Sequence, residues 1–67
     1  MDAQQTQHWR TVLREQGRSI AWLADTTGRP RATVYGYARG DRRPTAEWLA
    51  KASEALGVPV DNTERAA

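Results

Sequence analysis

The sequence contains no cysteine and only one histidine, His8. The first absence excludes a disulfide framework and a thiolate metal site, and one histidine alone builds neither a zinc site nor a histidine-based catalytic group. No apolar run is long enough for a membrane span or a signal peptide. We therefore expect a soluble, intracellular protein that needs no cofactor and binds neither a membrane nor a small-molecule ligand.

Lysine is nearly absent, and the positive charge comes from nine arginines that are unevenly distributed. The segment 10–43 contains eight arginines and three acids, a net charge of +5, whereas the segment 44–67 has a net charge of −2. A basic segment of this kind suggests an anionic partner. A solvated basic surface in an arginine-rich proteome explains the same composition equally well, so charge alone does not decide between them.

The 67 residues are enough for one small domain, and their apolar spacing predicts helices rather than strands. Apolar residues recur three and four positions apart in four segments, and a glycine follows each segment where a helix would end. Serine or threonine precedes three of these segments as a candidate N-cap, beginning with Thr6. We expect an all-α domain over residues 6–60, with helices at 6–16, 20–27, 30–39 and 45–56 and flexible tails at 1–5 and 61–67.

A set of residues at fixed spacings resembles the Cro/C1-type helix-turn-helix family, also called the XRE family. The second expected helix contains the pair Leu23-Ala24, and Gly28 occupies the turn before the third. The resemblance implies a small four- to five-helix, lambda-repressor-like domain whose second and third helices form a helix-turn-helix for double-stranded DNA. It covers residues 8–60, with matches at Gly17, Ser19, Leu23, Ala24, Gly28, Thr33, Val34, Tyr37, Gly40, Pro44, Thr45, Leu49, Leu56, Gly57 and Val58.

The sequence departs from the family pattern at four places. Ile20 replaces a glutamine that braces a phosphate in many members, and Pro30 replaces the usual serine or threonine cap of the third helix. Trp22 stands where a polar residue is common. The chain after residue 60 is polar, where many members have a fifth helix. Ile20 concerns the usual phosphate contact of the family, and the polar chain after residue 60 concerns its usual dimer interface.

The third expected helix has an outward face opposite its apolar stripe. With Val34 facing the core and 100° per residue, Arg31 lies near the N-terminus on the outward side, where it is placed for a bidentate contact with guanine. Ala32 can meet a thymine methyl group, and Tyr35 can reach a base edge or a phosphate or simply cover the surface. A glycine in the same face lets the backbone approach a groove floor. The candidate base contacts are Arg31, Ala32, Tyr35 and Gly36.

Residues around this helix are placed for the phosphate backbone. Arginines stand in the turn before the helix and in the turn after it, and Thr33 lies on the side that faces the second helix. Contacts to phosphates set register and affinity rather than the choice of sequence. The candidate phosphate contacts are the helix cap Ser19 together with Arg29, Thr33, Arg39, Arg42 and Arg43.

Three tryptophans are many for a domain of this size. Trp9 lies on an apolar stripe and is predicted to be in the core. Trp48 lies beside the inner stripe of its helix, and with Val58 and Val60 it forms the expected homodimer interface, since an exposed tryptophan often marks a contact surface. The alternative is that Trp48 packs over the two valines within one chain. Trp22 is assigned no role.

Together these features predict a sequence-specific transcriptional regulator, most simply a minimal Cro-like phage repressor that binds a pseudo-palindromic operator as a dimer. It would act in the cytoplasm of a bacterial host, on the nucleoid. One alternative is a protein-interaction module on the same fold, such as an antitoxin or a phage accessory factor, whose contact surface would be Trp22 and Trp48. Another is the N-terminal DNA-binding domain of a longer repressor. No enzyme is expected, because no nucleophile–base pair, carboxylate pair or phosphate-binding glycine loop is present.

Overall fold

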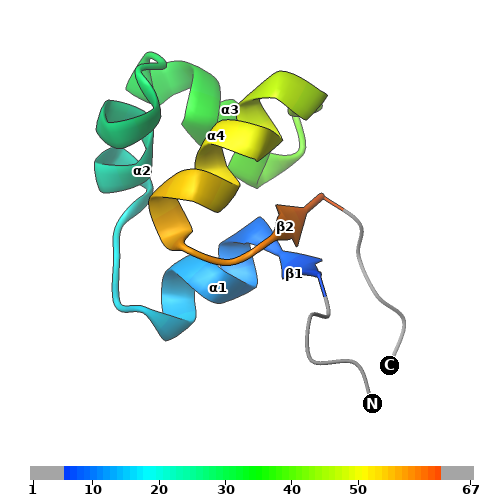
Figure 1. The fold of residues 1–67 in the computed structure, drawn as a ribbon. Coiled ribbons are helices and arrows are strands. Elements are labelled where there is room, and N and C mark those ends of the chain that lie inside the picture. The colour runs from blue at the N-terminus through cyan, green and yellow to red at the C-terminus, as the bar shows by residue number, and fades with distance from the viewer. Residues whose placement is uncertain (1–5, 63–67) are drawn as a thin grey trace.

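The structure is a computed structural model that describes residues 6–62, and the chain in this range forms four helices and two very short strands (Figure 1). This confirms the expected small all-α architecture. No helix of the described range is long and apolar enough to cross a membrane. The elements are β1 (Gln7–His8), α1 (Trp9–Glu15), α2 (Ile20–Thr27), α3 (Arg31–Arg39), α4 (Ala46–Leu56) and β2 (Val60–Asp61).

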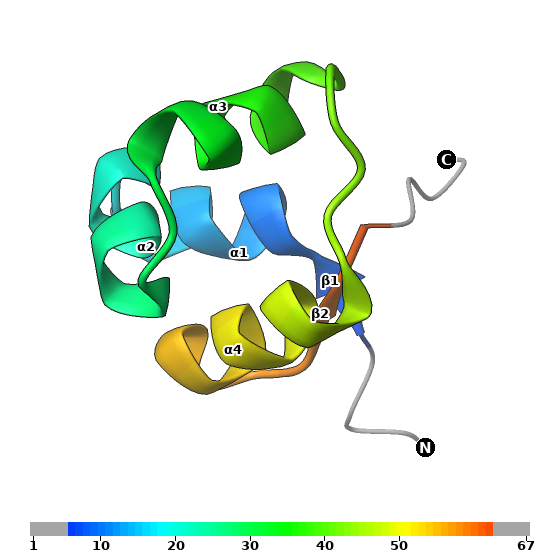
Figure 2. The ribbon, with the colours of Figure 1, turned by 90° about the horizontal axis from the view of Figure 1, so that it is seen from above.

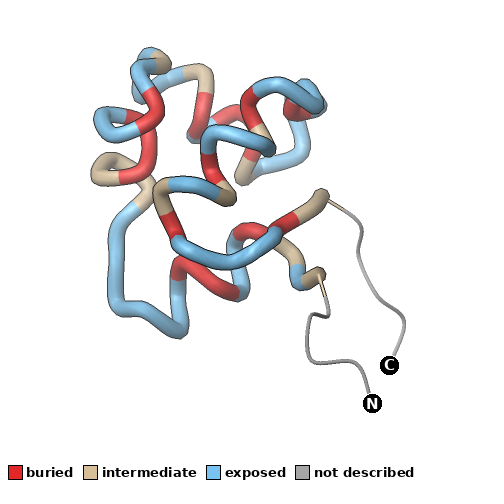
Figure 3. The backbone as a smooth tube through the Cα atoms, viewed as in Figure 1, coloured by how far each residue is buried: buried red, intermediate tan, exposed pale blue. Residues whose placement is uncertain are grey.

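The helices enclose a single core, and α3 lies at one edge of the molecule, with the ribbon of α4 on the opposite side (Figure 2). Helix α2 packs against both α3 and α4, and α1 packs against α4. Along each helix, buried positions alternate with exposed ones, as expected for short amphipathic helices around a small core (Figure 3). Helix α3 therefore has one long side that no other helix covers.

Side-chain caps fix where two of the helices begin. Ser19 Oγ and Thr45 Oγ1 each accept a hydrogen bond of 3.0 Å from the backbone N–H three residues later. Both caps are those that the sequence predicts, and each satisfies a donor that the first helical turn leaves free. The predicted cap Thr6 is wrong, because residues 7–8 form a strand and His8 Nδ1 caps α1 instead.

A left-handed glycine ends α2 and lets the chain turn into α3. Gly28 has a φ of +78°, a conformation that other residues rarely adopt. The N–H of Arg29 then donates to the carbonyl of Ala24 at 3.0 Å, which satisfies one of the last carbonyls of the helix. Pro30 is the N-cap of α3 and makes no side-chain hydrogen bond there. This tight turn fixes the relative placement of α2 and α3.

The two ends of the described chain are joined by the parallel pair β1–β2. Gln7 pairs with Val60 and His8 with Asp61, and Trp9 Nε1 donates a hydrogen bond of 3.1 Å to Asn62 Oδ1. The flexible tail that the sequence predicts for 61–67 is therefore wrong at residues 61 and 62. The predicted tail segments 1–5 and 63–67 lie outside the described residues.

Removing the Asn62 side chain is expected to destabilise the domain through Trp9. Trp9 is fully buried, and Asn62 is the acceptor of its indole N–H. Because an unpaired buried donor costs about 1–3 kcal/mol, Asn62→Ala should lower the melting temperature measured by circular dichroism. Gln7→Ala, an exposed position in the same strand pair, is the control and should melt like the parent. Equal melting of both variants and the parent would contradict this role.

Trp48 is the centre of the core. Its side chain is 0% exposed, and its ring lies 5.2 Å from the ring of Trp9 and 4.9 Å from the ring of Tyr37, centre to centre. Its Nε1 donates to Thr27 Oγ1 at 3.0 Å, and the Thr27 hydroxyl in turn donates to the carbonyl of Leu23 at 2.8 Å. Trp48 is thus packed and hydrogen-bonded within one chain.

Two of the three residues predicted to form a dimer interface, Trp48 and Val60, are buried within one chain. Trp48 is 0% exposed and Val60 is 7% exposed, so neither offers surface to a second copy. Only Val58, 41% exposed, remains on the surface. Trp48 lies beside the predicted inner stripe of α4, and the structure includes it in that stripe. The alternative packing within one chain is the one that the structure shows for Trp48.

Candidate nucleic-acid interface

The uncovered side of α3 presents the residues that the sequence places there. Val34 and Tyr37 point into the core, whereas Arg31, Ala32 and Tyr35 are exposed. Tyr35, at 41% exposed, is one of the two large apolar or aromatic side chains left exposed in residues 6–62. The structure therefore brings three of the four predicted base-contact residues together on one face.

Gly36, the fourth predicted base contact, is buried rather than exposed with the other three. It is buried, because the side chain of Arg42 returns over it from the turn after α3. A Cβ atom built on Gly36 would lie 3.2 Å from Arg42 Cδ and 3.4 Å from Arg42 Cγ. The helical periodicity of α3 does place Gly36 outward, but periodicity takes no account of a segment that folds back. The absence of a side chain at Gly36 leaves room for the Arg42 side chain.

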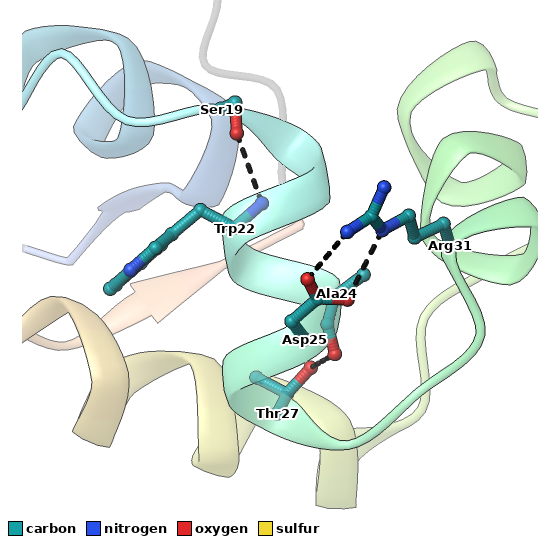
Figure 4. A network of polar contacts seen from close by, with 6 residues as sticks. All are labelled: Ser19, Trp22, Ala24, Asp25, Thr27 and Arg31. Carbon is teal, nitrogen blue, oxygen red and sulfur yellow. Dashed lines mark hydrogen bonds and ion pairs between the residues drawn. The ribbon is translucent and has the colours of Figure 1, made fainter.

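Arg31 is held by an acid that the sequence did not single out. Its Nη2 lies 2.8 Å from Asp25 Oδ2 and its Nε lies 3.2 Å from Asp25 Oδ1, so the pair is bidentate (Figure 4). The hydrogen bond from Arg31 lowers the pKa of the Asp25 carboxyl, and the same bond raises the pKa of Arg31. Both side chains remain well exposed, at 61% for Arg31 and 58% for Asp25. Asp25 is the single acid between positions 15 and 41, and that isolation is the signal that could have identified it.

Arginines gather around the C-terminal end of α3. They line an open depression of about 460 Å³, the basic depression, which lies between this end of α3, the start of α1 and Asn62. Arg10 Nη1 donates to the carbonyl of Ala38 across the depression, and within residues 6–62 no ion pair engages Arg42 or Arg43. In the same range, no group of three His, Cys, Asp or Glu side chains could hold a metal ion. The arginines that line the depression are Arg10, Arg39, Arg42 and Arg43.

The other predicted phosphate contacts differ in how freely they can reach a ligand. Arg39 is exposed, and its Nε lies 3.1 Å from Asp41 Oδ2. Ser19 is exposed, and while its oxygen caps α2 its hydroxyl hydrogen can still be donated. Thr33 and Arg29 are half-buried, and Arg29 Nη1 donates to the Tyr37 hydroxyl at 3.5 Å. Ser19 and Arg39 are therefore the more accessible members of this set.

Trp22 is half-buried on α2 and is covered by an arginine. The guanidinium carbon of Arg18 lies 4.2 Å from the centre of the Trp22 ring, which is the geometry of a cation–π contact. The contact shields one face of the ring from water. Trp22 thus offers only part of its apolar surface to any partner.

The chain matches the family profile of a helix-turn-helix domain over residues 6–66. No curated protein and no solved structure matches it. Because the match extends over most of the sequence, the chain belongs to this helix-turn-helix domain family. Membership confirms the helix-turn-helix part of the expected resemblance and indicates a DNA-binding regulator.

Proposed function

We propose that this helix-turn-helix protein is a transcriptional regulator that recognises a specific sequence in double-stranded DNA, with α3 in the major groove. The observation that carries the proposal is the uncovered face of α3, where Arg31, Ala32 and Tyr35 are exposed together. The nine residues of α3 span about 13 Å at 1.5 Å per residue. A major groove about 12 Å wide admits a helix of this kind, and α2 would then lie across the backbone.

In this arrangement the contacts with DNA fall into two groups, one to the bases and one to the phosphates. Arg31, with two parallel N–H donors, would bind guanine O6 and N7, and Ala32 and Tyr35 would contact neighbouring base edges. The phosphate group consists of residues at the two ends of α3 and at the start of α2. These would set the register and supply the salt-dependent part of the affinity. They are Ser19, Arg29, Thr33, Arg39, Arg42 and Arg43, joined by Arg10 at the basic depression.

The biological role that fits best is that of a Cro-like phage repressor on a pseudo-palindromic operator. Two copies would occupy half-sites about 34 Å apart and block a promoter. In residues 6–62 the exposed large side chains of apolar or aromatic type are Tyr35 and Val58. This small apolar surface supports a dimer that assembles on the DNA rather than in free solution.

The alternative role as a protein-interaction module depends on two tryptophans that are largely covered. Its contact residues would be Trp22 and Trp48. Trp48 is 0% exposed and Trp22 lies beneath Arg18, so these two residues provide no large apolar patch for a tight protein partner. The arginines near α3 favour nucleic acid over this alternative.

Selection from a pool of random DNA duplexes tests the proposal. The protein is expected to enrich one sequence, to protect it with two-fold symmetry in a footprint, and to bind it at least about 10³-fold more tightly than a scrambled duplex. Affinity for both duplexes should fall as salt rises, because phosphate contacts release counterions. Equal, weak binding to both duplexes that disappears in higher salt would show phosphate contacts only and would contradict sequence recognition.

A further inference from the structure

We propose that Asp25 is a positioning residue that holds Arg31 for guanine and so sets the base specificity of α3. The inference rests on the proposed function, since it assigns a second residue to the same recognition surface. The two residues come from different helices. Asp25 lies in the last turn of α2 and Arg31 is the first residue of α3, so their contact spans the turn of the helix-turn-helix (Figure 4).

The contact uses one edge of the guanidinium and leaves another edge free. A guanidinium has five N–H donors, and Asp25 takes one from Nε and one from Nη2. Three donors remain, two on Nη1 and one on Nη2. One N–H of Nη1 and one N–H of Nη2 point in the same direction. They form the parallel pair of donors that guanine O6 and N7 can accept. Asp25 thus occupies the side of Arg31 that base recognition does not need.

Holding Arg31 in this way should favour its contact with a base over a contact with a phosphate. A free arginine at a helix N-terminus samples many rotamers and pairs with any phosphate within reach. An arginine already held by two hydrogen bonds loses less freedom when it meets a base in one geometry. The carboxylate of Asp25, ionised at neutral pH like an ordinary aspartate, also repels phosphate oxygens, and the hydrogen bond from Arg31 lowers its pKa further. Asp25 would therefore weaken nonspecific contacts while it supports the specific one.

The test compares Asp25→Asn with a matched control, Asp41→Asn. Both changes remove one negative charge from an exposed acid that pairs with an exposed arginine, Arg31 in one case and Arg39 in the other. Dissociation constants are measured for the selected duplex, for duplexes with each base pair replaced in turn, and for a scrambled duplex. Melting temperatures are measured in parallel.

We expect Asp25→Asn to reduce the preference for the selected duplex at least about fivefold, and only at the base pair where Arg31→Ala also loses preference. Affinity for the scrambled duplex should stay equal or rise, because a negative charge is lost. In an Arg31→Ala background, Asp25→Asn should cause no further loss of preference. Asp41→Asn should leave the preference at every base pair unchanged.

Two results would overturn the inference alone. One is full retention of the base preference in Asp25→Asn while Arg31→Ala loses it. The other is an equal loss of affinity for all duplexes with a lower melting temperature, since that is the signature of a structural role. A parent protein with no preference among duplexes would instead overturn the proposed function and the inference with it.

Discussion

Replacing Trp48 with alanine should remove most of the stability of the domain. Trp48 is 0% exposed, contacts the rings of Trp9 and Tyr37, and donates the hydrogen bond that Thr27 accepts. Truncation of a buried tryptophan costs about 3–5 kcal/mol through lost contacts and the cavity left behind. A domain of this length has roughly 3–10 kcal/mol of total stability. Urea denaturation followed by circular dichroism should therefore show a midpoint shifted far down, or no folded baseline.

The matched control is Val58→Ala. Val58 belongs to the same predicted interface but is 41% exposed, and a surface change of this kind alters stability by about 0.5 kcal/mol or less. The pair distinguishes the core role of Trp48 from the dimer role that the sequence predicts. A Trp48→Ala variant that stays fully folded and only loses self-association would show that the burial of Trp48 has been misassigned.

Arg31→Ala should relax the sequence preference at one base pair. Arg31 is exposed at the start of α3 with one bidentate edge free, so its loss removes a contact that distinguishes guanine from other bases. We expect binding to the selected duplex to weaken about 5- to 150-fold, with much less change on a duplex that already carries a wrong base there. Fluorescence anisotropy with a set of single-base variants of the duplex measures this.

Arg43→Ala is the counterpart of this change on the phosphate side. Arg43 lines the basic depression, and no ion pair within residues 6–62 engages it. Its loss should weaken binding to all duplexes by a similar factor and reduce the slope of log affinity against log salt by about 1. If Arg31→Ala and Arg43→Ala gave the same pattern of losses, the division into base and phosphate contacts would be wrong.

Local signals in the sequence are enough to predict most of the helices. The predicted bounds of α2 coincide with those of the structure, because Ser19 caps one end and Gly28 closes the other. Thr45 and Gly57 bound α4 in the same manner. These signals act over three or four residues of chain, so they can be recognised without knowledge of the tertiary structure.

The errors involve contacts between distant parts of the chain. The strands β1 and β2 have two residues each and pair across more than fifty positions. Neither is long enough to show the alternation of apolar and polar residues that predicts a strand. Arg42 covers Gly36 from a turn whose path the periodicity of α3 does not determine. The hydrogen bond that Trp48 makes with Thr27 joins α4 to α2, and it satisfies the indole N–H of this buried tryptophan.

The candidate site was predictable in outline but not in detail. The helical wheel of α3 correctly places Arg31, Ala32 and Tyr35 on the exposed face, because Val34 and Tyr37 anchor the opposite one. What remained hidden is the set of contacts that orient those side chains. The pairing of Asp25 with Arg31 depends on the path of the turn at 28–30, and the position of Arg10 at the basic depression depends on how α1 packs.

The most direct test of the account is a nuclear magnetic resonance titration of the ¹⁵N-labelled protein with the selected duplex. The account predicts that the largest shift changes fall on α3 from Arg31 to Tyr35, on the turn at 40–43 and on the start of α2. Resonances of α4 between residues 49 and 56 should change little, since that helix packs mainly on α2 and α1 and lies across the molecule from the exposed face of α3 (Figure 2). Changes concentrated on α4, or no changes on α3 at saturating DNA, would contradict a recognition role for α3.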